Sequence, residues 1–262
     1  MARFKVWLEY QGTKYRGWQI QQNARTVQGE LRQALATVFP DTEFEFQGAG
    51  RTDAGVHALL QVAHLDVKTS LSCESVRRRL NDALPADVNI LKITPASPRF
   101  HARHHAQARS YLYQISRRRT ALGKNFVWWV REELDVGAMR QAAALFLGMK
   151  DFRSFTDDEP DAKSTRALIE NVEIVEEGDL ILVRVRGSHF LWKMVRRIIG
   201  VLVEVGKGKL TEDDVRSFLK APSARPAELT APASGLFLEA VVYEGDQDER
   251  PLESVIKVSR PG

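Results

Sequence analysis

Three glycines close together require a sharp turn in the first third of the chain. The stretch Gln47–His57 reads Q-G-A-G-R-T-D-A-G-V-H. Glycine adopts backbone conformations that other residues avoid, and it lets neighbouring backbone or a ligand approach closely. Residues 43–46 and 60–67 alternate between polar and apolar side chains, which predicts a strand on each side of the loop. We therefore expect a strand, a glycine-rich loop that carries Arg51 and Asp53, and a second strand.

The shape of this loop leaves its role open. An aspartate beside a glycine is most often a turn residue that bonds its own backbone. The dinucleotide-binding pattern G-x-G-x-x-G has Asp53 at its third glycine position here, and no long helix pattern follows. The phosphate-loop pattern G-x-x-x-x-G-K-[ST] is absent as well. The rest of the chain decides whether Asp53 is a turn residue or part of an active site.

Composition is typical of a soluble globular protein. Hydrophobic residues make up 44% of the 262 positions and charged residues 27%. No apolar run is long enough for a transmembrane helix, and the first residues alternate like a strand rather than a signal peptide. The only cysteine, Cys73, excludes an intrachain disulfide and a cysteine-based metal site. We expect a cytoplasmic protein that has no membrane partner.

Positive charge is concentrated in a few segments, although the net charge is only +4. Residues 99–119 contain six arginines and no acid, and residues 184–209 contain seven lysines and arginines against Glu204. Arginines 77–79 form a third cluster, while acids gather at 157–161 and 244–249. Such clusters attract a polyanion by neutralising its phosphates, although a salt-bridged surface is the common alternative. The arginines around Tyr111 and Tyr113 favour nucleic acid as the partner.

Strand and helix patterns do not alternate strictly along the chain. Strands are predicted at Phe4–Tyr10, Val88–Ile93, Ser110–Ser116, 166–176, 179–186 and 236–243. Helices are predicted at 26–39, 73–83, 135–149, 190–205 and 211–220, with Thr26, Asp135 and Thr211 as N-caps. This order indicates an α+β fold in which helices cover one face of mainly antiparallel sheets. The expected organisation is an N-terminal half (1–104), a C-terminal half (105–245) and a partly disordered tail (246–262).

Several motifs together resemble the tRNA pseudouridine synthase A family. The glycine-rich loop Gly48–Ala58 is similar to that family's signature. The other similar segments are Tyr15–Gln19 with Thr26–Gln28, Phe100–Arg103 with Ala108–Tyr111, Phe190–Gly200, and Ala233 with Gly235–Leu236. The resemblance extends from about Val6 to Tyr243 and favours an active-site role for Asp53.

The resemblance implies a homodimer of α+β subunits, each with two related halves that meet at an RNA-binding cleft. It implies a tRNA substrate and the isomerisation of uridines 38, 39 and 40 in the anticodon stem-loop to pseudouridine. This reaction is redox-neutral, and the family implies no cofactor and no metal. His101, His104 and His105 lack a carboxylate or cysteine at ligand spacing, so phosphate contact is the favoured role for them. A non-catalytic RNA-binding protein remains the alternative from a different class.

The resemblance also implies roles for individual residues. Asp53 is the expected nucleophile, which attacks either the sugar or the uracil ring. Arg196 is expected to pair with Asp53 and favour its ionised form, although a helix residue that extends its charge to solvent is the alternative. Tyr111 is expected to stack on the extruded base and move the C5 proton, unless it is only a packed strand residue. We expect Arg51, Arg103, Arg109, Lys193 and Tyr111 to bind the RNA, with a carboxylate contact left open for Arg51.

Overall fold

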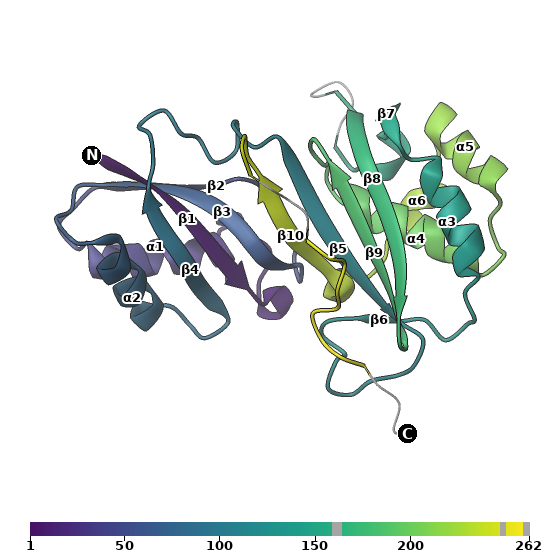
Figure 1. Cartoon of the computed structure of the whole chain (residues 1–262), viewed down its shortest axis with the longest axis horizontal. Helices are drawn as coiled ribbons and strands as arrows, with labels where there is room; N and C mark the ends of the chain where they lie inside the picture. Colours follow the sequence, from purple (N-terminus) through teal and green to yellow (C-terminus); the bar gives the residue numbers. More distant parts are fainter. Residues whose placement is uncertain (159–163, 247–249, 259–262) are drawn as a thin grey trace. The chain divides into compact units, whose positions relative to one another are not determined.

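The computed structural model describes residues 1–158, 164–246 and 250–258. The chain forms two compact units (Figure 1). Unit 1 comprises Met1–Gln107 and Phe237–Asp246, and unit 2 comprises Ala108–Leu236 and Gln247–Gly262. The strand expected at 236–243 therefore belongs with the N-terminal residues rather than with the C-terminal half, because it pairs with a strand of unit 1.

Unit 1 is built on a mainly antiparallel sheet. Its strands are β1 (Ala2–Tyr10), β2 (Phe44–Gly48), β3 (His57–Val67), β4 (Val88–Pro95) and β10 (Leu236–Val242). Strand β1 lies between β3 and β4 and is antiparallel to both, and β2 is antiparallel to β3. Strand β10 is parallel to β3, with Phe237 opposite His57. This pairing places the last strand, β10, beside His57, where the glycine-rich stretch ends and β3 begins.

Two helices complete unit 1, and both lie on one face of its sheet (Figure 1). They are α1 (Val27–Val38) and α2 (Cys73–Ala83). Thr26 caps α1 by accepting a hydrogen bond from Gly29 N, as its residue type predicts. Helix α2 ends at the exposed Ala83, and the next residue, Leu84, takes the buried position. A short 3₁₀ turn (Gly12–Lys14) follows β1.

The sheet of unit 2 is again mainly antiparallel. Its strands are β5 (Ala108–Ser116), β6 (Trp128–Trp129), β7 (Gly148–Asp151), β8 (Arg166–Glu177) and β9 (Leu180–Gly187). Strand β9 is antiparallel to both β5 and β8, and β7 is antiparallel to β8. The short β6 is parallel to β5. The predicted hairpin across Gly178 is confirmed, and so is the mixed α/β architecture with mainly antiparallel sheets.

The helices of unit 2 cover one face of its sheet (Figure 1). They are α3 (Val136–Ala144), α4 (Met194–Gly206), α5 (Glu212–Lys220) and α6 (Arg225–Glu228), with 3₁₀ turns at Arg153–Phe155 and Ala233–Gly235. Within the described ranges, no helix is both long enough and apolar enough to cross a membrane.

Two of these helices are shorter than predicted. The helix expected to run from Asp135 to Met149 ends at Ala144, and Gly148, with φ +87°, begins strand β7 instead. The helix expected from Phe190 begins at Met194, because Lys193 has φ +63°. A left-handed residue cannot continue a right-handed helix. Both boundaries thus depend on backbone conformations that hydrophobic periodicity does not reveal.

The C-terminal tail is ordered by specific contacts where it is described. Ser254 donates from its backbone N–H and its hydroxyl to the carboxylate of Glu177, at 2.9 and 2.7 Å. The backbone N–H of Val255 donates to Gln114 Oε1 at 2.7 Å, and Val258 is buried. Residues 250–258 therefore belong to unit 2, whereas residues 247–249 and 259–262 of the tail, which was expected to be partly disordered, lie outside the described residues.

Candidate active site

The three glycines of the stretch between β2 and β3 differ in why the structure has glycine there. A Cβ atom on Gly48 would lie 2.5 Å from the ring of Trp18, so this glycine allows the indole to pack against the backbone. Gly55 has φ +80°, which favours glycine. A Cβ atom on Gly50 would meet no described atom within 4 Å. Two of the glycines are thus explained by the fold of unit 1, and Gly50 is not.

The segment that follows β1 holds the loop on both sides of Asp53. The hydroxyls of Tyr10 and Thr52 are hydrogen-bonded at 2.8 Å in a buried position. The backbone N–H of Trp18 donates to the carbonyl of Thr52 at 3.0 Å. The N–H of Gly55 donates to the carbonyl of Tyr15 at 3.2 Å. The residue before the aspartate and the turn after it are therefore both anchored to residues 10–18.

Two further glycines let this segment approach the loop. A Cβ atom on Gly12 would lie 1.9 Å from the carbonyl oxygen of Val56. Gly17 has φ +97°, and a Cβ atom there would lie 2.7 Å from the carbonyl oxygen of Thr52. The N–H of Gly12 also donates to Nδ1 of His57 at 3.0 Å. Neither glycine can be replaced without moving the backbone of the Asp53 loop.

Sequence reasoning placed residues 14–22 in a loop and gave Tyr10 no role. The signal that could have revealed the contact is the motif Tyr15–Gln19, whose glycine and tryptophan both touch the Asp53 loop. His57 is a further buried polar residue at this place, and its ring stacks on Phe237 with centroids 4.8 Å apart. Phe237 thus packs against the end of the loop.

Asp53 is half-buried, and its carbonyl accepts a hydrogen bond from Val56 N at 3.1 Å, which closes a turn. The backbone of Asp53 therefore does form a turn, as its neighbouring glycine suggests. Arg51 is exposed, and no described carboxylate forms an ion pair with it. This arrangement leaves the Arg51 guanidinium accessible to a phosphate and does not support its pairing with Asp53.

Tyr111 and Arg109 lie on β5 of unit 2 and contact one short segment after β9. The ring of Tyr111 packs edge-on against Phe190, with centroids 5.0 Å apart. Arg109 donates to the carbonyl of Ser188 at 2.9 Å. Tyr113, two residues along the same face, is fully buried, whereas Tyr111 keeps partial exposure. Of these two tyrosines, Tyr111 is therefore the one whose side chain stays partly accessible.

Arg196 and Lys193 lie at the start of α4. Arg196 Nε donates to the carbonyl of Ala231 at 2.7 Å, and the side chain is half-buried. Lys193 Nζ lies 2.6 Å from a carboxylate oxygen of Asp157, which also pairs with Arg197. Arg197 is only 3% exposed, so this charged side chain of α4 is packed rather than solvated. Asp53 belongs to unit 1, and these cations belong to unit 2.

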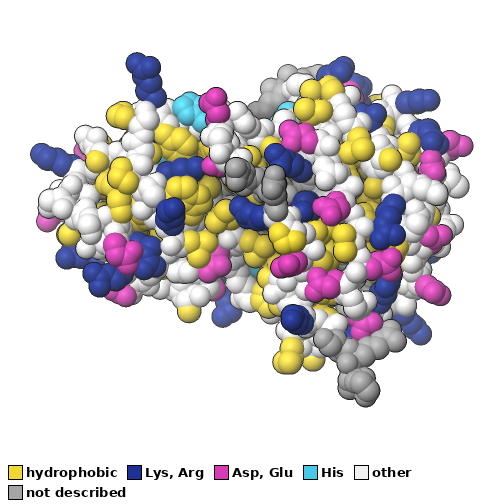
Figure 2. Space-filling view, in the orientation of Figure 1, with side chains coloured by type: hydrophobic (Ala, Val, Ile, Leu, Met, Phe, Trp, Pro, Cys, Tyr) yellow, Lys and Arg dark blue, Asp and Glu magenta, His cyan; other side chains and the backbone are white. Residues whose placement is uncertain are grey.

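Many arginines of the predicted basic clusters are neutralised inside unit 2. Arg184 and Arg186 of β9 pair with glutamates of β8, at 3.2 and 2.9 Å. Arg117 pairs with Glu176 of the same strand. Figure 2 shows the consequence on one face, where lysine and arginine side chains are interspersed with acids. The salt-bridged alternative therefore holds for these three arginines.

The histidines of the predicted RNA-binding segment form a ring cluster in unit 1. The rings of His101 and His104 lie 4.2 Å apart, and those of His101 and His64 lie 4.8 Å apart. Nδ1 of His101 accepts the backbone N–H of Arg103 at 3.2 Å and that of His104 at 3.3 Å. Among the residues that the structure describes, no three histidine, cysteine or acidic side chains are arranged to hold a metal ion. The cluster shapes the turn that presents the exposed Arg103.

Comparisons with known proteins identify the family of this chain. The family model described as tRNA pseudouridine synthase matches residues 7–105 and 142–244. The protein named tRNA pseudouridine synthase A of Brucella ovis is 40% identical over 248 residues, which cover 93% of this chain and 98% of the relative. The protein of the same name from Brucella melitensis biotype 1 shows the same identity and coverage. Together with the glycine-framed Asp53 loop, these matches show that the chain belongs to the tRNA pseudouridine synthase family, whose members are isomerases.

Proposed function

We propose that this protein converts uridines 38, 39 and 40 of the tRNA anticodon stem-loop to pseudouridine, with Asp53 as the nucleophile. The observation that carries this proposal is the anchoring of the Asp53 loop by Tyr10, Tyr15 and Trp18 in a chain of this family. A nucleophile gains from a fixed position, because orientation before reaction removes part of the entropic barrier. A turn residue in a surface loop would not require such anchoring.

The proposed reaction balances without an added reagent. The Asp53 carboxylate adds to C1′ of the ribose or to the uracil ring, and the N1–C1′ bond breaks. The uracil turns and a bond forms between C5 and C1′, while the bond to the Asp53 carboxylate breaks and the free carboxylate is restored. The proton on C5 leaves and N1 gains a proton. No electrons enter or leave, so the residues need only supply a nucleophile and move one proton.

Tyr111 and Arg196 of unit 2 complete the proposal. The partly exposed ring of Tyr111 offers a face for the extruded base, and its hydroxyl moves the C5 proton. Arg196 favours the ionised form of Asp53. The exposed Arg51 and Arg103 bind phosphates, and so does Arg109 beside Ser188. Lys193 binds RNA only by exchanging its contact with Asp157 for a phosphate.

Replacement of Asp53 by asparagine tests the nucleophile. The amide keeps the size and hydrogen bonding of the side chain but is a poor nucleophile. We expect Asp53→Asn to bind tRNA like the wild type and to form no pseudouridine, as measured by mass spectrometry of tRNA incubated without cofactor. Asp82→Asn is the matched control, because Asp82 is an exposed acid on α2 of the same unit. Turnover by Asp53→Asn at the control's rate would refute the assignment.

We further propose that the protein acts in the cytoplasm as a homodimer. A two-fold dimer lets one subunit hold the body of a tRNA whose anticodon arm is bound by the other. Light scattering is expected to give twice the 29.6 kDa of one chain. Full activity of a monomer at working concentration would contradict this proposal.

A further inference from the structure

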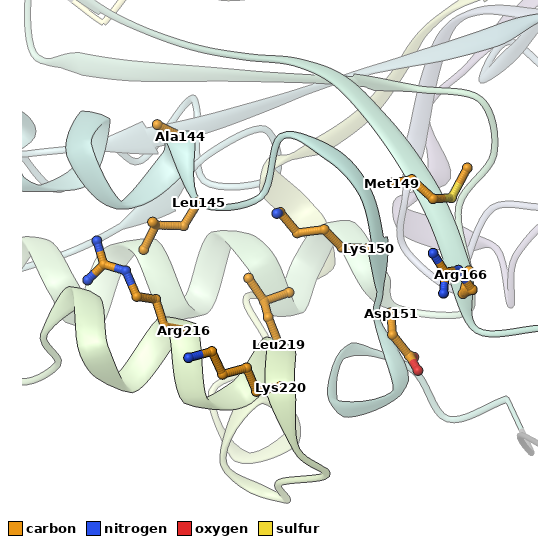
Figure 3. A pocket seen from close by; sticks show the side chains of 9 residues that line it. All are labelled: Ala144, Leu145, Met149, Lys150, Asp151, Arg166, Arg216, Leu219 and Lys220. Carbon is orange, nitrogen blue, oxygen red and sulfur yellow. The ribbon is translucent and has the colours of Figure 1, made fainter.

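Unit 2 carries a surface hollow of about 530 Å³ that lies outside every motif discussed above (Figure 3). It is formed by the end of α3, strand β7, the start of β8 and helix α5. Its apolar lining comes from Ala144, Leu145, Met149 and Leu219. Figure 3 shows Leu145, Leu219 and Lys150 directed into the same space from three different elements. The hollow thus combines an apolar floor with a cation at its centre.

The remaining lining is strongly basic. Lys150, Arg166, Arg216 and Lys220 contribute four positive charges, against one acid, Asp151. None of these cations falls in the three basic clusters that the sequence displays, because β7, β8 and α5 bring them together only in the folded unit.

The ion pairs that these side chains form determine the net charge of the hollow. Arg216 is neutralised by Glu212 at 2.7 Å and Asp213 at 2.9 Å. Asp151 is engaged by Arg153, and it also accepts a hydrogen bond from Thr165 at 2.6 Å. No carboxylate among the described residues forms an ion pair with Lys150, Arg166 or Lys220. These three cations are therefore available to bind an anionic ligand, whereas Arg184 and Arg186 of β9 are paired with glutamates.

We propose that this hollow is an RNA-backbone site, in which Lys150, Arg166 and Lys220 contact phosphates and a ribose lies over Leu145 and Leu219. The choice of RNA as the ligand rests on the proposed function, since tRNA is the polyanion that this family acts on. Phosphate contacts of this kind fix where an RNA lies without reading its bases. The site would therefore add affinity for tRNA and take no part in the chemistry.

Salt dependence of tRNA binding tests the proposal with the full-length protein. Each phosphate contact that is lost reduces the slope of log K against log salt by about 0.7–0.9. The variant Lys150→Gln/Arg166→Gln/Lys220→Gln is expected to show a slope reduced by about 2 to 3 and affinity at low salt reduced at least about tenfold. Its turnover at saturating tRNA should equal that of the wild type.

Single variants provide the matched comparison and guard against misfolding of the triple variant. Lys150→Gln should lower the slope by about 0.7–0.9, the value for one phosphate. Lys124→Gln removes an exposed lysine of the same unit that lies outside the hollow, and it should leave the slope unchanged. Melting temperatures of both variants should match the wild type, because each side chain is replaced by a polar one at the surface.

Two results would overturn the proposal. An unchanged slope and affinity in the triple variant would show that no phosphate lies in the hollow. A change in molar mass by light scattering with unchanged tRNA binding would make the hollow an interface between copies of this chain. The assay measures binding alone, so it is independent of the Asp53→Asn result. An active Asp53→Asn enzyme would refute the nucleophile and leave the binding curves interpretable.

Discussion

The hydroxyl of Tyr10, at the end of strand β1, lies 2.8 Å from the hydroxyl of Thr52, which directly precedes Asp53 in the loop. The two residues are 42 positions apart in the chain, and the contact is buried. Because Thr52 is also bonded through its carbonyl to Trp18, the peptide that leads into Asp53 is fixed from both its side chain and its backbone. We infer that Tyr10 positions the aspartate through Thr52 without touching the substrate.

Removal of the Tyr10 hydroxyl should therefore lower turnover more than binding. Tyr10→Phe is expected to reduce kcat while KM and tRNA affinity stay near the wild-type values, and to cost about 1 kcal/mol of stability. Tyr243→Phe is the control, since Tyr243 is another buried tyrosine of unit 1 and donates to the carbonyl of Ala102 at 2.6 Å. Equal kcat values for the two variants would show that the Tyr10 hydroxyl serves stability alone.

Replacement of glycines in and near the loop should show which of them the fold of unit 1 requires. Gly12→Ala places a methyl group 1.9 Å from the carbonyl oxygen of Val56, so it should destabilise unit 1 by about 2–3 kcal/mol through forced backbone movement. Gly50→Ala meets no described atom within 4 Å and should change the free energy of unfolding by less than about 1 kcal/mol. Urea unfolding of the two variants measures the difference. Similar destabilisation by both would contradict this account of the loop.

The histidine cluster should make unit 1 sensitive to acid. Burial lowers the pKa of His101, and the neighbouring His104, Arg3 and His105 lower it further, while Glu45 opposes them. Burial is also the main cause that lowers the pKa of His64. As the pH falls, these histidines therefore bind protons at a higher pH in the unfolded chain than in the folded one. Their contribution to the free energy of unfolding is full above pH 6.5 and falls as the pH drops below that value. Protonation of His101 would also break the two backbone hydrogen bonds that its Nδ1 accepts.

Asparagine can replace Nδ1 of these histidines as an acceptor without titrating. We expect the double variant His64→Asn/His101→Asn to lose less stability than the wild type between pH 7.5 and pH 5.5, as measured by urea unfolding at each pH. Retention of the full wild-type loss in the double variant would assign the acid sensitivity to other groups.

Tyr111 carries two proposed roles that substitution can separate. Tyr111→Phe keeps the ring and its edge-on contact with Phe190, so base stacking worth about 1–3 kcal/mol should survive. If the hydroxyl moves the C5 proton, this variant should bind tRNA normally and retain tritium at C5 of the target uridine. Tyr111→Ala should lose both binding and turnover. Release of tritium from the Phe variant at the wild-type rate would remove the hydroxyl from the mechanism.

Local signals account for much of what could be predicted. Thr26, Asp135 and Thr211 cap their helices as expected, because an N-cap depends only on its own side chain and the next few backbone N–H groups. Alternating patterns located the strands for a related reason, since side chains of a strand point to opposite faces wherever one face is buried. Helix ends were less predictable. Lys193 and Gly148 adopt positive φ values that no periodic pattern encodes.

The sequence by itself determined the α+β class, the main elements and the family, and it singled out Asp53 through the glycines and motif around it. Only the tertiary structure decided which distant residues meet that loop, such as Tyr10 with Thr52 and Gly12 with Val56. It also decided which charges remain available, because glutamates of β8 neutralise arginines of β9 across the strands. Such contacts depend on strand order and register, which place residues far apart in the chain side by side, and a local pattern carries no information about them.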